Sequence, residues 1–171
     1  MAAVELRIVH EIAAALERVE AAVLDRRLLA RMPAFAPAIV EARELSRQAD
    51  GAVVERVAFF RAGALPGALT ALVPGIRTTW IERTRWDLRA HTASFVVEPQ
   101  LPEALRRRVV CGGCYSLEAR GPGRTRRAIV GELRIEAPVI GHRAEVVLER
   151  VIAAQFAGEA ALLAALAGDP G

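Results

Sequence analysis

Three side chains in this sequence could do acid–base chemistry if the fold brings them together. Glu82 lies between two tryptophans in the run TWIERTRWD, His91 follows closely, and Tyr115 lies directly after a Cys-x-x-Cys motif. An acid and a base that converge on one bound molecule can promote enolisation and dehydration of a carbonyl compound. A catalytic hypothesis therefore requires Glu82, His91 and Tyr115 to come within hydrogen-bonding distance of a common ligand.

The two cysteines are candidates for a metal site or a reactive thiol. Cys111 and Cys114 are three residues apart, and on a strand such side chains point to opposite faces. They could share a metal only if Gly112 and Gly113 form a bulge, and no second pair completes a zinc site. We therefore expect no metal or other cofactor, and cysteines that serve as packing residues.

Composition places these residues in one globular domain over 1–171. The chain has 171 residues, of which 53% are hydrophobic and 5% aromatic, and this size buries enough surface for a core. All 23 basic side chains are Arg, and Lys and Asn are absent, which we interpret as the codon bias of a GC-rich bacterial genome.

The charge distribution disfavours nucleic acid as a partner. The net charge of +3 is a small excess of 23 basic over 20 acidic groups. Two clusters could contact phosphates or anionic lipid, although such runs commonly form a solvated face. They are Arg106, Arg107 and Arg108, and Arg124, Arg126 and Arg127. Aromatic residues do not interleave with them, as nucleic-acid binding would favour.

The sequence also predicts a cytoplasmic protein without stable membrane insertion. The first 20 residues carry acidic side chains where a signal peptide needs a basic start and an apolar run. No uninterrupted apolar stretch reaches the length that spans a bilayer.

Hydrophobic periodicity predicts seven strands and three helices. Alternation of apolar and polar residues indicates half-buried strands, and spacings of three and four indicate amphipathic helices. Pro33 and Pro37 are expected to end the second helix. In chain order the elements are a strand over 4–11, two short helices within 13–31, hairpins over 39–62, 76–99 and 107–137, and a long helix through 147–168.

This order predicts an α+β domain. Six consecutive strands with short turns should pair as an antiparallel meander, and the last helix can bury its apolar stripe only across the concave face. The result is a curved seven-stranded sheet with two short helices and a long C-terminal helix over a cavity.

At this level the chain resembles the START-like superfamily, also called SRPBCC, Bet v 1-like or polyketide cyclase/dehydrase. The resemblance rests on VHEIAAALERVEAAVLD, on LPGALTALVPG with Trp80 shortly after it, and on IEAPVIGHRAEVVLERVIAAQFAGEAALLAAL. Within the superfamily the chain looks closest to a bacterial family of unknown function. The resemblance implies a helix-grip fold and a lipophilic cavity, and it carries over no catalytic residue.

The alternation also predicts which side chains face the cavity. Placing Arg83 and Arg85 inward would bury unpaired charges, so Trp80 and Trp86 point in. In the last strand the face with Ile129 and Leu133 should meet the helix. The expected ligand-binding residues are Trp80, Glu82, Trp86, His91, Phe95, Cys111, Tyr115, Ile129 and Leu133 on strands, and Val151 and Gln155 on the helix.

Three functions fit this reading. The first is binding or carriage of a hydrophobic small molecule, such as a lipid or a polyketide-like metabolite, without catalysis. The second is an aromatase/cyclase-like enzyme that uses Glu82, His91 and Tyr115, although Glu82 could instead form a structural ion pair. The third is a protein-interaction module with a filled core. The apolar segment 63–75 would form a gate at the cavity mouth or an interface of a homodimer.

Overall fold

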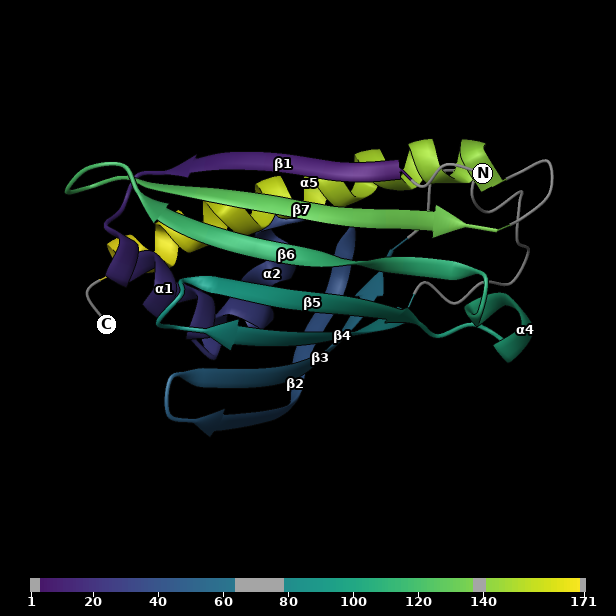
Figure 1. Cartoon of the computed structure of the whole chain (residues 1–171), viewed down its shortest axis with the longest axis horizontal. Coiled ribbons are helices and arrows are strands. Elements are labelled where there is room, and N and C mark those ends of the chain that lie inside the picture. The colour runs from purple at the N-terminus through teal and green to yellow at the C-terminus, as the bar shows by residue number, and fades with distance from the viewer. Residues whose placement is uncertain (1–3, 64–78, 137–140, 170–171) are drawn as a thin grey trace.

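Seven strands form one antiparallel sheet, and three helices lie on one of its faces (Figure 1). The computed structural model describes residues 4–63, 79–136 and 141–169. The elements are β1 (Val4–Ile12), α1 (Leu16–Leu24), α2 (Arg27–Phe35), β2 (Ile39–Asp50), β3 (Val53–Ala62), β4 (Thr79–Asp87), β5 (Thr92–Pro99), α4 (Glu103–Arg106), β6 (Val109–Ala119), β7 (Thr125–Ile135) and α5 (Gly141–Gly168).

The strand order β1-β7-β6-β5-β4-β3-β2 confirms the predicted meander. The β2–β3 hairpin turns at Gly51, whose φ of +57° is in the left-handed region that glycine adopts without steric cost. Between β4 and β5, the Asp87 carboxylate accepts hydrogen bonds from the backbone N–H groups of Arg89 and Ala90. Residues 64–75 of the predicted gate or interface lie outside the described residues.

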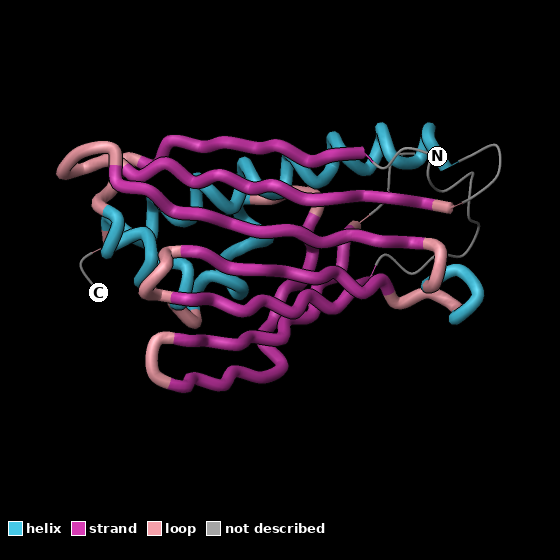
Figure 2. The backbone as a smooth tube through the Cα atoms, in the orientation of Figure 1, coloured by secondary structure: helices cyan, strands magenta, loops and turns pink. Residues whose placement is uncertain are grey.

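The first strand completes the sheet by pairing with the last. The β1–β7 register runs without a shift from Val4 opposite Leu133 to Ile12 opposite Thr125. The Thr125 hydroxyl, which is fully buried, donates a hydrogen bond to the Ala14 carbonyl at 2.8 Å. The sheet edges are β1 and β2, and two register shifts in β2 accompany the bend of β2 and β3 toward the helix side (Figure 2).

The two short helices form where the spacing predicts them, but one boundary is wrong. The Asp25 carboxylate accepts the Arg27 backbone N–H at 2.7 Å, which satisfies a free donor in the first turn of α2. The prediction that Pro33 ends α2 is wrong, because the helix continues to Phe35 and Ala36 N–H still bonds to the Met32 carbonyl. Burial of Leu28, Leu29 and Met32 stabilises the helix despite the backbone hydrogen bond that Pro33 lacks.

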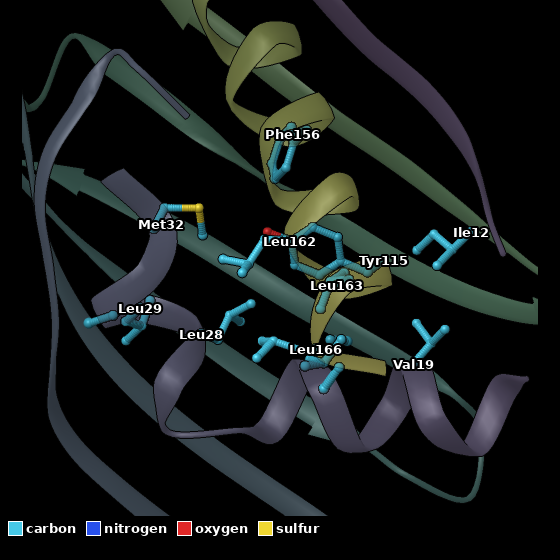
Figure 3. Close-up of a cluster of buried hydrophobic side chains, with 14 of the residues drawn as sticks. Ile12, Val19, Leu28, Leu29, Met32, Tyr115, Phe156, Leu162, Leu163 and Leu166 are labelled. Carbon is cyan, nitrogen blue, oxygen red and sulfur yellow. The ribbon is translucent and has the colours of Figure 1, made fainter. Parts of the chain in front are cut away.

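The predicted long helix, α5, contacts α1, α2, β1 and β7. Figure 3 shows its residues Leu162, Leu163 and Leu166 packed among side chains of α1 and α2. By length and composition alone the segment Arg143–Gly168 could cross a membrane, but its C-terminal half packs against α1 and α2 in the core. A Cβ at Gly158 would overlap the Phe35 carbonyl oxygen, so glycine lets α5 approach the end of α2.

Candidate functional site

The β4 side chains point to the faces predicted from the arginines at 83 and 85. Trp86, Glu82 and Thr84 are buried on the helix side of the sheet, and Trp80 is half-buried there. On the opposite side Arg83 pairs with Glu98 at 2.9 Å, and Arg85 pairs with Glu55 at 3.4 Å. The strand therefore presents two tryptophans, a carboxylate and a hydroxyl to the space under α5.

One end of this face is closed by aromatic packing. Tyr115 stacks on Trp86 and on Phe95, with ring centroids 5.6 and 4.6 Å apart, and the Phe156 ring of α5 meets it edge-on at 5.8 Å. Ile129 is also fully buried. At this end the expected ligand-binding residues Trp86, Phe95, Tyr115 and Ile129 are parts of the hydrophobic core.

The other end is less completely covered. Trp80, Val97 and Cys111 lie on the inward faces of their strands, and Val151 and Gln155 lie on α5, yet all five are only half-buried. Leu133, from the same set, is buried. Burial of the inward side chains therefore decreases from the aromatic end toward Trp80. An inward side chain that keeps accessible surface borders open space.

A pair of glycines separates the two ends. Gly113 on β6 pairs with Gly131 on β7, so neither strand projects a side chain toward α5 at this position. A Cβ at Gly131 would lie 2.6 Å from the Gly112 carbonyl oxygen, which excludes any larger residue without a backbone shift. The close approach of these two strands therefore requires glycine at both positions.

Glu82 is the most perturbed acid that borders this face. Its residue is 7% exposed, and its Oε1 accepts a hydrogen bond from the Thr84 hydroxyl at 3.1 Å. Burial, and next the negative charge of Glu159, raise the pKa of Glu82 to about 7, while Arg56 and Arg127 oppose the shift. Around neutral pH the carboxyl group therefore exists in both protonation states.

Arg127 is the main side chain here that the sequence analysis missed. It is 2% exposed, faces inward from β7 and pairs with Glu159 of α5. Its guanidinium lies over the rings of Tyr115 and Phe156, 5.3 and 5.4 Å from their centroids. Alternation along β7 would have predicted its inward position, because Arg127 lies on the same face as Ile129. The sequence of the strand does not indicate the ion-pair partner, which lies on α5.

The three proposed catalytic side chains do not come together. His91 lies in the β4–β5 turn with φ of +53°, and its Nδ1 is 3.0 Å from Glu20 Oε1 on α1. The turn and this contact place His91 beside α1 at the end of β4 and β5, away from Glu82 in the middle of β4. Burial, and next the Glu82 charge, raise the pKa of Tyr115 well above 10, so the phenol stays protonated.

The cysteines occupy opposite faces, as predicted. The β6–β7 register passes through Cys111 and Cys114 without a bulge, and Cys114 is exposed. Burial and the Glu82 charge raise the pKa of Cys111 to about 12. Among the described residues, no three His, Cys, Asp or Glu side chains are placed to hold a metal ion.

Solved structures share this fold at low sequence identity. An aromatase/cyclase, Zhui from Streptomyces sp. R1128, superposes with a TM-score of 0.69 at 14% identity, covering 97% of this chain and 94% of that one. A START superfamily protein from Mycobacterium smegmatis gives 0.58 at 15%, covering 90% and 92%. Ara h 8.0201 gives 0.56 at 14%, covering 95% and 99%.

These neighbours confirm the START-like helix-grip fold. No functionally curated protein matches the sequence. A family model described as a protein of unknown function, DUF2505, matches residues 7–166, and the chain therefore belongs to this family.

Proposed function

We propose that this protein binds and carries a hydrophobic small molecule between the concave face of its sheet and α5. The observation that supports this proposal is the difference in burial along that face. Leu162 and Leu163 are fully buried at the aromatic end, whereas Trp80, Val97 and Val151 keep accessible surface at the other. A cavity between these half-buried side chains would account for the difference.

The lining fits an apolar ligand with one polar group. Burial of about 300 Å² of apolar ligand surface contributes about 7 kcal/mol, from which the cost of immobilising the ligand is subtracted. Glu82 and Thr84 supply the polar contact, and a protonated Glu82 can donate to a carbonyl or hydroxyl oxygen. The carrier we propose is cytoplasmic and needs neither a cofactor nor nucleic acid. A homodimer stays a prediction.

Native mass spectrometry of protein purified from its own host tests carriage directly. We expect a bound mass that organic extraction removes and that identifies the cargo. Protein that shows no extractable mass, and that also fails to bind added apolar probes, would contradict the proposal.

Two neighbouring valines provide a matched test of where the ligand binds. Val97 faces inward and is half-buried, whereas Val96 faces outward and is 53% exposed. We expect Val97→Phe to weaken binding of the neutral fluorescent probe N-phenyl-1-naphthylamine at least tenfold, because the ring occupies the proposed cavity. Val96→Phe should bind as the wild type does. Equal affinity of both variants for the probe would place the ligand elsewhere.

The raised pKa of Glu82 favours a second candidate, an aromatase/cyclase-like enzyme. A buried carboxyl group that is half-protonated near pH 7 can act as a general acid or base. The test is exchange of α-protons of a bound 1,3-diketone with deuterated solvent, followed by NMR. Glu82→Gln should retain the ligand and lose the exchange, whereas equal exchange in both proteins would exclude this role.

A further inference from the structure

A second concave region lies beside α4, which Figure 1 shows at one end of the sheet. It has a volume of about 960 Å³ and is bordered by the ends of β2, β3, β4 and β5 and by α4. Its β3 side chains, Phe59 and Arg61, alternate with Phe60, which is buried on the helix side. Phe59 and Arg61 therefore face away from the space under α5, whereas Ala62 and Pro99 of the same lining follow the inward alternation. We refer to this region as the rim hollow.

Three arginines from three elements border the rim hollow. They are Arg43 of β2, Arg61 of β3 and Arg106 of α4, and among the described residues of the lining the only carboxylate is Glu41. Three positive charges and one negative charge leave the lining with a local charge of +2. Such a surplus in a concave site attracts an anion.

Glu41 orients two of these guanidinium groups without neutralising both. Its Oε1 accepts from Nε of Arg43 at 3.3 Å, and its Oε2 accepts from Nε of Arg61 at 3.1 Å. Because Arg43 uses only Nε in this contact, its two terminal nitrogens remain available as donors. A guanidinium held in one orientation loses less freedom when it binds an anionic oxygen.

Arg106 contributes a charge that no carboxylate offsets in the part of the chain that the structure describes. Its neighbour Arg107 takes the nearby Glu103, four residues earlier, as an ion-pair partner. Arg106 is exposed and borders the rim hollow from the side of α4. Its charge therefore adds to the positive surplus of the hollow.

The remaining lining contains the polar residues Thr79 and Gln100 and several apolar residues. Phe59 lies under the Arg43 guanidinium, with Cζ 4.8 Å from the ring centroid, and Pro99 and Leu101 border the same hollow. An inorganic anion would leave Phe59, Pro99 and Leu101 uncovered, and a neutral hydrocarbon would leave the surplus positive charge of the lining unused. Both kinds of surface are used together only by a molecule that has an anionic end and an apolar end.

We propose that the rim hollow is a binding site for an anionic amphiphile, in which a phosphate or carboxylate group is attached to an apolar chain. The anionic group lies between the three arginines, and the apolar chain lies along Phe59, Pro99 and Leu101. This site goes beyond the interior carrier function and does not depend on it.

Calorimetric titration with octyl phosphate tests the proposal. Octyl glucoside, which has the same chain and a neutral head, and inorganic phosphate are the matched ligands, and both should bind at least tenfold more weakly. Arg43→Gln and Arg61→Gln should each weaken octyl phosphate binding about tenfold, since each removes a charge-assisted hydrogen bond. Arg7→Gln, at a 71% exposed position on β1, should leave the affinity unchanged.

One further variant distinguishes the charge of Arg43 from its planar shape, and a second distinguishes binding at the rim hollow from binding in the interior. Arg43→Lys keeps the charge but loses the planar fork over Phe59, so we expect an intermediate loss of about threefold. Val97→Phe, which would fill the interior, should bind octyl phosphate as the wild type does. If octyl phosphate binding falls in Val97→Phe but not in Arg43→Gln, the ligand lies inside and the rim-hollow proposal is wrong.

The titration has other outcomes that would overturn the proposal. These are equal affinity for octyl glucoside and octyl phosphate, or equal losses in Arg7→Gln and Arg43→Gln. Vesicles of phosphatidylcholine with and without phosphatidylglycerol distinguish two sources of the same chemistry. Binding to the anionic vesicles that Arg43→Gln weakens indicates a bilayer lipid, and binding of octyl phosphate alone indicates a free metabolite.

Discussion

Replacement of Glu82 by glutamine should change how stability depends on pH. The carboxyl is buried, and its pKa is raised from 4.5 to about 7. Between these two values the folded state binds more protons than the unfolded state, so the free energy of unfolding falls as the pH rises. Below pH 4.5 the contribution is fully present, and above about pH 7 it is lost.

The size of this effect follows from the two pKa values. The interval from 4.5 to about 7, at about 1.4 kcal/mol per pH unit, corresponds to about 3 kcal/mol. Glutamine has the same shape and does not titrate. The stability of Glu82→Gln relative to the wild type should therefore rise by about 3 kcal/mol between pH 4.5 and pH 8.

Urea denaturation of both proteins at several pH values measures this difference, and the other titrating groups cancel in the comparison. The control is Glu55→Gln, which replaces a carboxylate exposed on the outer face of β3. Its difference in free energy of unfolding from the wild type should not rise by about 3 kcal/mol over this pH range. A Glu82→Gln difference that stays constant within about 0.5 kcal/mol from pH 4.5 to pH 8 would refute the reasoning.

Two other predictions concern the helix α5 and the thiols. Gly158→Ala should lower the melting temperature although alanine favours helix, because its Cβ would overlap the Phe35 carbonyl; Gly168→Ala, where a Cβ meets nothing within 4 Å, should not lower it. Equal melting temperatures for the two variants would show that α5 does not need this close approach. At pH 8 Ellman's reagent should modify Cys114 rapidly and Cys111 slowly, since only Cys114 is exposed and the pKa of Cys111 is about 12. Equal rates, measured with Cys114→Ser as the reference, would contradict the assigned faces.

The sequence predicts the sheet well because alternation is a local signal. On β4 the arginines at 83 and 85 exclude one face from the interior, and this fixes the inward position of Glu82. The same rule applies to β7, but the inward Arg127 was overlooked because a charged residue on an apolar face is expected only when a partner compensates it. That partner, Glu159, lies on α5, 32 residues later.

Other features depend on contacts between elements that are distant in the sequence. Pro33 lies within α2 because burial of neighbouring side chains outweighs the lost hydrogen bond, and sequence alone does not give that balance. His91 follows a strand-like pattern but lies in a turn beside Glu20 of α1. The rim hollow combines ends of several elements, so its arginines look unrelated along the chain.

The pairing of β1 with β7 has a consequence for how the chain folds. Ile12 lies opposite Thr125, so β1, the first strand in the chain, pairs with β7, the last one. This pair can form only when the whole chain between the two strands has been brought together. Closing so long a loop costs entropy before any contact compensates it. We therefore expect slow folding, in which the β2–β6 meander forms first and the β1 edge waits unpaired, exposed to a chaperone or to another chain.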